Sequence, residues 1–225
     1  MKGSMERWAA STGVGFAIVF LISGFLPGTP PKWFATADDI QWYLQGKHKE
    51  ILAAMILSGL AAILFLWFLS TFAGMFREAG QGRLATVMYG AGVATIAIAS
   101  IGDGIQLGLS KVTYTADQVT VATMYGVGTW LYARIFWTMA ALGLATWLAA
   151  RRANVLPSWY TLVSLAGSCI WILSGLSLKD DGFFSITGGM GMIGFIAMAV
   201  WVALSSVLLM QRVDAHATGT APAMG

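Results

Sequence analysis

Six apolar runs, each about as long as a bilayer is thick, constrain this chain more than any other feature of its sequence. An α-helix needs about 20 predominantly apolar residues to cross the hydrocarbon core. The runs that meet this length are residues 8–26, 51–76, 84–109, 128–150, 159–178 and 186–210. Their apolar residues lie on all sides, as expected of helices that face both lipid and protein. The sequence therefore predicts an all-α fold, a polytopic membrane bundle of about six transmembrane helices, as one domain over residues 1–210.

Scarcity of charge supports this fold class. Only 10% of the residues are charged and 57% are hydrophobic, whereas a soluble domain carries about 25% charged residues. The net charge of +3 comes from 13 basic and 10 acidic residues spread along the chain, which is too little to hold a nucleic-acid backbone. We expect membrane lipids around this protein and no nucleic-acid partner.

The basic residues between the runs predict an orientation. With six crossings, both termini share a side. That side carries Lys2, Arg7, Arg77, Arg83, Arg151, Arg152 and Arg212, and the opposite side carries Lys32, Lys47, Lys49, Lys111 and Lys179. Arg77 and Arg83 share one short loop, and Arg151 and Arg152 share another. The positive-inside rule is most reliable for short loops. We expect both termini of this multi-pass membrane protein in the cytoplasm. Residues 27–31 do not resemble a cleavage site, so the first run is expected to be a retained helix.

The first long loop contains a pattern typical of a helix start. Thr36 precedes Asp38 and Asp39, which matches an N-cap followed by acids in the first turn. A short helix along the outer membrane surface is one interpretation. An irregular loop anchored by Trp33 and Trp42 at the interface is the other.

Two further boundaries follow from local composition. The start of the fourth helix is open between residues 119 and 130, or earlier at a second cap formed by Thr115 and Asp117. Residues 211–225 are polar or small and are predicted to form a disordered cytoplasmic tail.

Asp103 is a carboxylate inside the third run. At about 1.5 Å per residue, it lies roughly 30 Å from Arg83, and Arg134 lies roughly 25 Å from Arg151. Because the two have similar heights on neighbouring helices, a structural ion pair between them is one hypothesis. The other hypothesis is an outward-facing vestibule at Asp103 and Arg134. Further polar groups would come from Gln106, Tyr132 and Tyr125.

Glycines within the runs predict close contacts between helices. Gly104 and Gly108 are spaced as small-xxx-small, and Gly191 and Gly194 begin the sixth run. Small residues at this spacing let helix backbones approach each other. A flexible gate at residues 188–191 is the alternative, and no phosphate-binding loop accompanies these glycines.

Residues that carry chemistry are few. His48 and His216 are the two histidines, and neither lies inside a run, which excludes a haem held by two intramembrane histidines of this chain. His48 could bind a metal with Asp38 and Asp39, but a solvated cationic boundary is the favoured interpretation. Cys169 is alone in an apolar run. We expect no metal, no cofactor and no enzymatic activity.

Three local features carry a resemblance to a family. They are residues 27–32 running to Lys47-His48-Lys49, the segment Phe76-Arg77-Glu78 followed by Gly82-Arg83-Leu84-Ala85, and Val155-Leu156-Pro157-Ser158-Trp159. In these the chain resembles an uncharacterised family of six-span integral membrane proteins of bacteria, frequent in actinobacteria. The resemblance implies the same topology and no particular activity.

With the resemblance, the sequence predicts a non-enzymatic multi-pass protein of the bacterial inner (plasma) membrane. It would be an accessory or interaction subunit that binds a membrane-protein partner or a second copy. The alternative is a small-solute carrier or channel with the vestibule at Asp103 and Arg134. An enzyme acting on a lipid has the least support, because no nucleophile–base pair accompanies these residues.

Overall fold

The described part of the chain folds into seven helices joined by loops. The computed structural model describes the backbone of residues 2–217 and the side chains of residues 7–215. The helices are α1 (Lys2–Phe25), α2 (Ala37–Gly46), α3 (His48–Glu78), α4 (Gly82–Val112), α5 (Gln118–Ala153), α6 (Ser158–Gly175) and α7 (Gly189–Ala217). The all-α prediction is confirmed.

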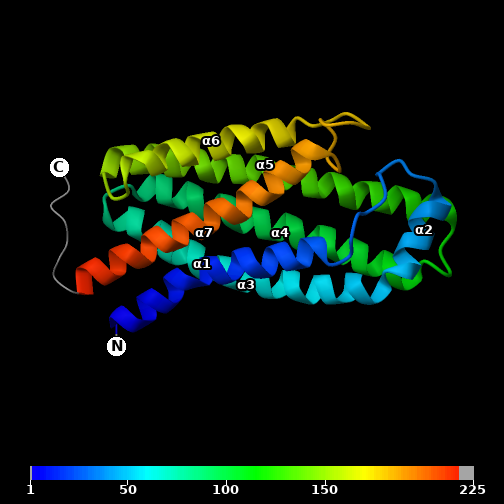
Figure 1. The fold of residues 1–225 in the computed structure, drawn as a ribbon, viewed down its shortest axis with the longest axis horizontal. Coiled ribbons are helices and arrows are strands. Elements are labelled where there is room, and N and C mark those ends of the chain that lie inside the picture. Colours follow the sequence, from blue (N-terminus) through cyan, green and yellow to red (C-terminus); the bar gives the residue numbers. More distant parts are fainter. Residues whose placement is uncertain (1, 218–225) are drawn as a thin grey trace.

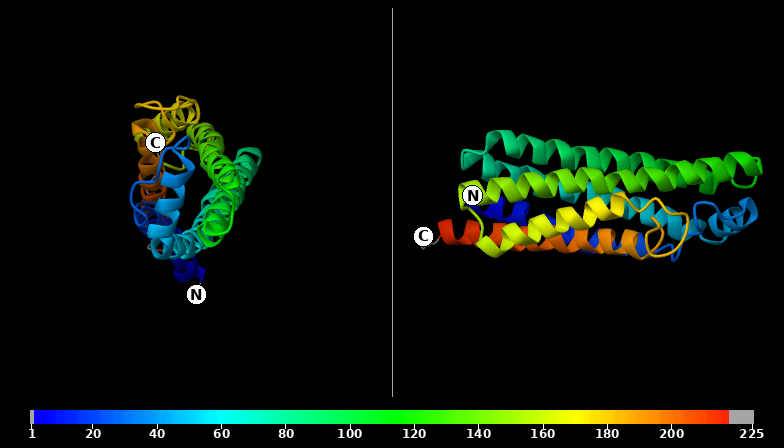
Figure 2. Two further views of the ribbon diagram at one scale, coloured as in Figure 1. Left: turned by 90° about the vertical axis from the view of Figure 1, so that its right-hand side faces the viewer. Right: turned by 90° about the horizontal axis from the view of Figure 1, so that it is seen from above.

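The six longer helices form a closed ring. Each packs against the next along the chain, α1 on α3, then α4, α5, α6 and α7, and α7 returns to α1 (Figures 1 and 2). The closing contact is made by Ser206 of α7, whose hydroxyl donates to the carbonyl of Ala10 and accepts from the backbone N–H of Val14 at 3.2 Å. Gly13 lies directly against Phe68 and Ser206, so its missing side chain allows this approach.

Both described chain ends lie at one end of the bundle, and α2 lies at the other (Figure 1). We call these the terminal end and the α2 end. Five helices are long and apolar enough to cross a membrane, namely α1, α3, α4, α5 and α7. The membrane-bundle prediction is confirmed, with a span count one lower than the expected six. The difference is α6, whose 18 residues include four serines. It still packs along α5 as the fifth of the six helices in the ring (Figure 1).

Several predicted boundaries shift. The helix expected at residues 128–150 begins at Gln118, where the Asp117 side chain accepts from the N–H of Thr120 at 2.9 Å, so the earlier cap was the correct choice. The last two spans, expected at 159–178 and 186–210, are α6 ending at Gly175 and α7 beginning at Gly189.

The predicted disordered tail is wrong in its first part. α7 continues as helix to Ala217, because nothing in residues 211–217 is a glycine or proline that would end it. Residues 218–225 lie outside the described part of the chain, and so does the side chain of His216.

Large aromatic side chains fill the middle of the ring. Trp201 is 2% exposed and has its ring centroid 5.8 Å from those of both Phe72 and Trp171. Its indole N–H donates to Ser164 Oγ at 3.2 Å, and that of Trp171 donates to the Gly194 carbonyl at 3.1 Å. The indole N–H groups therefore find partners within the apolar interior, as buried tryptophan requires.

The α2 helix confirms the cap predicted at Thr36. The Thr36 hydroxyl oxygen accepts from the Asp39 N–H at 3.2 Å. Ile40 and Leu44 are fully buried in a cluster with residues of α3, α4 and α5, whereas Trp42 is 78% exposed. Figure 1 shows that α3, α4 and α5 extend beyond α1 and α6 at this end, so α2 packs against their projecting turns.

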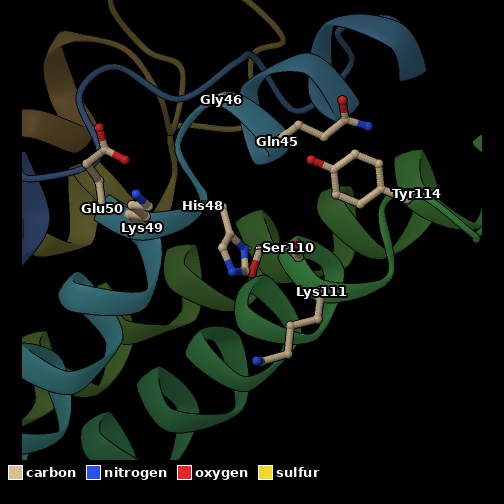
Figure 3. Close-up of a pocket in the computed structure, with 8 residues that line it drawn as sticks. All are labelled: Gln45, Gly46, His48, Lys49, Glu50, Ser110, Lys111 and Tyr114. Atoms are coloured by element: carbon tan, nitrogen blue, oxygen red, sulfur yellow. Dashed lines mark hydrogen bonds between the residues drawn. The ribbon is translucent and has the colours of Figure 1, made fainter.

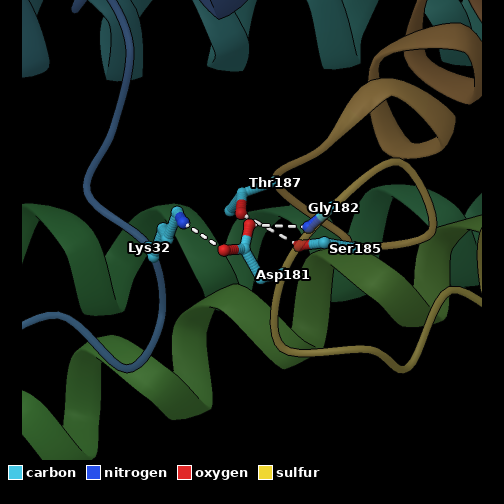
Figure 4. A network of polar contacts seen from close by, with 5 residues as sticks. All are labelled: Lys32, Asp181, Gly182, Ser185 and Thr187. Carbon is cyan, nitrogen blue, oxygen red and sulfur yellow. Dashed lines mark hydrogen bonds and ion pairs between the residues drawn. The ribbon is translucent and has the colours of Figure 1, made fainter.

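An ion pair joins two loops at the α2 end. Lys32 Nζ lies 2.8 Å from Asp181 Oδ2, and the other oxygen of Asp181 accepts from the Gly182 N–H at 2.6 Å (Figure 4). Two hydrogen bonds lower the pKa of Asp181, and the one from Lys32 has a larger effect than the one from Gly182. Gly182 has φ +83°, a conformation that favours glycine. The pair thus ties the α1–α2 loop to the α6–α7 loop.

This ion pair predicts a specific chemical cross-link. A carbodiimide is expected to couple the Lys32 amine to the Asp181 carboxylate, because the two groups are already in contact, and peptide mass spectrometry would detect the joined loops. Asp181→Asn should abolish the product and the neighbouring Asp180→Asn should leave it. A cross-link of equal yield in both variants would contradict this pairing.

Candidate functional site

Asp103 is held at a junction of three helices. Ser58 of α3 donates to Asp103 Oδ2 at 2.5 Å, and the Tyr132 hydroxyl of α5 donates to Oδ1 at 2.6 Å. Each carboxylate oxygen therefore accepts one hydroxyl. Hydrogen bonds of this kind between helices contribute about 0.6 kcal/mol on average in membrane proteins, up to about 1.7. We call Ser58, Asp103 and Tyr132 the carboxylate triad.

The predicted ion pair with Arg134 is wrong. No ion pair or hydrogen bond joins Asp103 and Arg134 in the described part of the chain, and Arg134 is exposed. Similar height on two helices does not determine which face of its helix each residue occupies. Residues two apart on an α-helix point in nearly opposite directions. Because Tyr132 faces Asp103, Arg134 is directed away from Asp103. The predicted vestibule therefore contains no guanidinium group from Arg134.

The other two residues predicted for a vestibule lie in separate places. Gln106 is half-buried between helices, with its amide nitrogen 3.7 Å from the position that a Cβ on Gly128 would occupy. Tyr125 is 1% exposed, and its hydroxyl donates to the Pro31 carbonyl at 2.9 Å. Gln106 therefore packs α4 on α5, and Tyr125 fastens the α1–α2 loop to α5. Of the five predicted residues, the structure brings Asp103 and Tyr132 into contact.

Sequence reasoning missed Ser58, although a usable signal existed. Ser58 lies 20 residues before the end of α3 at Glu78, and Asp103 lies 21 residues after the start of α4 at Gly82. Two antiparallel helices joined by a short loop place such residues at equal height. Equal height therefore indicates Ser58 as a partner of Asp103, because a neutral hydroxyl can donate to a carboxylate as an arginine does.

The four predicted packing glycines divide into three kinds. Gly194 lies directly against Ser174 of α6 and Phe136 of α5, as predicted. A Cβ on Gly191 would meet the carbonyl of Ile186, so Gly191 packs against the loop before its own helix. A Cβ on Gly104 or Gly108 would meet nothing within 4 Å. The prediction that these two pack helices together is therefore wrong within this chain, because both lie on the exposed face of α4.

No group of three or more potential metal ligands occurs among the described residues. His48, considered as a ligand with Asp38 and Asp39, instead has its Nδ1 3.1 Å from the Ser110 carbonyl oxygen. Since a carbonyl only accepts hydrogen bonds, Nδ1 is the donor. Asp38 accepts from the Gln118 side chain at 2.6 Å, and Asp39 from Thr36 at 2.7 Å.

The apolar helices and the closed ring define a multi-pass helical membrane protein. No protein-family model, no curated protein and no solved structure matches the chain. The resemblance to six-span bacterial proteins therefore stays a prediction, and the carboxylate triad must be interpreted from its own geometry.

The triad predicts a stability pattern that an Asp103–Arg134 pair would not produce. Asp103→Leu leaves two half-buried hydroxyls without their acceptor and is expected to cost about 1–3 kcal/mol of unfolding free energy. Arg134→Gln should change it by less than about 0.5 kcal/mol. Unfolding by a denaturing detergent, followed by tryptophan fluorescence, measures both.

The charge-swapped double variant separates the two arrangements most sharply. Asp103→Arg combined with Arg134→Asp should be as unstable as Asp103→Arg alone, since the two side chains face different surroundings. Recovery of stability in the double variant would contradict the geometry described above.

Proposed function

We propose that this chain is a non-enzymatic subunit of a bacterial inner (plasma) membrane assembly that binds a membrane-protein partner, or a second copy of itself, through α4. The observation that carries the proposal is the unused glycine face of α4. Of the 18 consecutive residues that are most apolar in α4, only 22% are buried within the chain, against 56% for α5. Gly90, Gly104 and Gly108 on the exposed side of α4 each leave open space where a side chain would be.

Helix association in lipid favours such a face. Lipid chains are as apolar as leucine, so helices associate through close van der Waals packing over small residues. Within this chain, Gly13 and Gly194 already serve that purpose at the α1–α7 and α6–α7 contacts. The glycines of α4 offer the same surface without an occupant, and a helix of another chain would fit against them.

The arginines at the terminal end predict the orientation of this subunit in the membrane. The loop between α3 and α4 and the end of α5 carry arginines, including Arg83 and Arg152 around a hollow of about 410 Å³. Short arginine-rich loops favour the cytoplasmic side, which would place the terminal end in the cytoplasm and the α2 end outside.

Site-specific photo-cross-linking tests the proposal. A photoreactive residue at Ile101, which is 56% exposed on α4, is expected to give an adduct of defined protein mass. Leu162, which is 66% exposed on α6, is the matched control and should give lipid adducts alone. Gly104→Leu should abolish the adduct at Ile101, because the added side chain fills the groove. Equal, lipid-only adducts at both positions, with a monomer mass under mild extraction, would refute the proposal.

A second candidate function, a small-solute carrier, is favoured by the carboxylate triad. A carboxylate at a junction of three helices is costly to place in a membrane and is a common component of ion pathways. In this case Asp103→Asn should impair flux in vesicles while the yield of folded protein is unchanged. Loss of yield together with flux would assign the triad to helix packing.

A further inference from the structure

A hollow of about 790 Å³ opens at the α2 end, between the start of α3 and the end of α4. Figure 3 shows His48 reaching from α3 to α4, with its ring beside Ser110. The hydrogen bond from His48 Nδ1 to the Ser110 carbonyl, at 3.1 Å, joins the two helices at this point. Ser110 is 2% exposed, and its hydroxyl donates to the Leu107 carbonyl at 2.8 Å. This wall of the hollow is therefore fixed by contacts within the protein.

Two lysine residues line the hollow from different helices. Lys49 comes from α3 and Lys111 from α4, and both side chains are exposed. Neither makes an ion pair with any residue that the structure describes. Glu50 is the acid in the lining, and its charge is offset by Lys47, whose Nζ lies 3.4 Å away. The hollow therefore has an excess of positive charge, and its complement is an anion.

The lysines stand where the apolar runs of their helices end. Lys49 is two residues before Ile51, the first residue of the apolar run of α3, and Lys111 is two residues after Leu109, the last of that of α4. Farther along α3, Leu52, Ile56 and Leu60 are exposed. They follow Lys49 by three, seven and eleven residues, so they lie on the same side of the helix as Lys49. A cationic hollow above an exposed apolar face is the arrangement in which a lipid phosphate meets lysine.

We propose that this hollow binds a phosphate group between Lys49 and Lys111. A lipid headgroup supplies such a phosphate, with its acyl chains over Leu52 and Ile56, and free inorganic phosphate supplies the same chemistry from solution. Lys111 lies on α4 one turn beyond Gly108, whereas Lys49 lies on α3. The variant at Lys49 therefore tests the site without a substitution on the proposed partner surface.

Binding to the purified full-length chain in a neutral detergent tests the proposal. The probes are dihexanoyl phosphatidylglycerol and inorganic phosphate, each titrated separately while the dissociation constant is measured. Lys49→Gln and Lys111→Gln should each weaken binding about fivefold, and the double variant should lose about 25-fold. Lys179→Gln is the matched control, because Lys179 is an exposed lysine at the same end that does not line the hollow.

The two probes distinguish the sources of the phosphate. Lysine-dependent binding of the lipid, with inorganic phosphate at least tenfold weaker, supports a headgroup site. Equal lysine-dependent binding of both supports a site for the free anion. If the double variant binds both probes as the unchanged chain does, if Lys179→Gln weakens binding equally, or if neither probe binds, the proposal is overturned. Gel filtration and unfolding of the unliganded variants verify that each is folded, since both lysines are exposed.

Discussion

Trp201→Ala is expected to lower the unfolding free energy by about 3–5 kcal/mol, the largest single-residue loss anticipated in this protein. Trp201 is 2% exposed in the middle of the ring, and its indole contacts Phe72 of α3, Trp171 of α6 and Tyr160 of α6. The alanine variant would leave a cavity bounded by three helices and would also remove the donor to Ser164. The surrounding helices cannot all move inward, because each is already packed against two neighbours.

Two variants give this expectation a scale. Trp42→Ala removes the same side chain at a position that is 78% exposed, and should cost less than about 0.5 kcal/mol. Trp201→Phe keeps most of the ring volume and loses the hydrogen bond to Ser164, so a cost of about 1 kcal/mol is expected. Denaturing-detergent titrations of the three variants provide the measurement. Equal stability of the alanine variants at positions 201 and 42 would mean that the ring interior is not packed as described.

A second large effect is expected at Gly194, which the sequence does not distinguish from Gly104. Gly194→Ala should destabilise the protein by about 1–3 kcal/mol. The new Cβ would collide with the Ser174 hydroxyl and with Phe136, 2.7 Å away. Ser174 cannot turn aside freely, because its hydroxyl donates to the carbonyls of Ile170 and Met190 at 2.9 and 3.0 Å.

Gly104→Ala is the matched control and should act in the opposite direction. Its Cβ would meet nothing within 4 Å, so the substitution removes glycine's conformational freedom in a helix interior and should stabilise the chain by about 0.4–1 kcal/mol. Thermal unfolding in detergent compares the two variants directly. A stabilised Gly194→Ala or a destabilised Gly104→Ala would contradict the helix contacts reported above.

This glycine pair also bears on the proposed partner surface. A Gly104→Leu variant that folds as stably as the unchanged chain, yet no longer captures a protein from a photoreactive residue at Ile101, would separate folding from association. The same glycine face would then be dispensable for the fold and needed for assembly, which is the behaviour expected of an interface between helices in lipid.

The carboxylate triad illustrates how far a sequence can define a site. The height of Asp103 followed from the rise of a helix, and Tyr132 was among the residues named beside it. Choosing Tyr132 over Arg134 as the partner required the rotation of α5 about its own axis, which depends on the packing of that helix against α4 and α6. Ser58 required in addition that α3 and α4 run antiparallel at equal height, a contact between residues 45 positions apart.

The sequence by itself determined that this is a helical membrane protein, because runs of about 20 apolar residues leave the backbone no hydrogen-bond partner in lipid other than its own helix. Caps depend on side chains within a few residues, so the sequence also predicted the cap at Thr36. It left the start of α5 open, and the structure places that start at Gln118. The tertiary structure alone decided that the helices close into a ring, that Gly194 is packed while Gly104 is open, and that Asp103 meets two hydroxyls instead of an arginine. These outcomes depend on which face each helix turns toward its neighbours, and in runs that are apolar on every side the sequence does not specify that rotation.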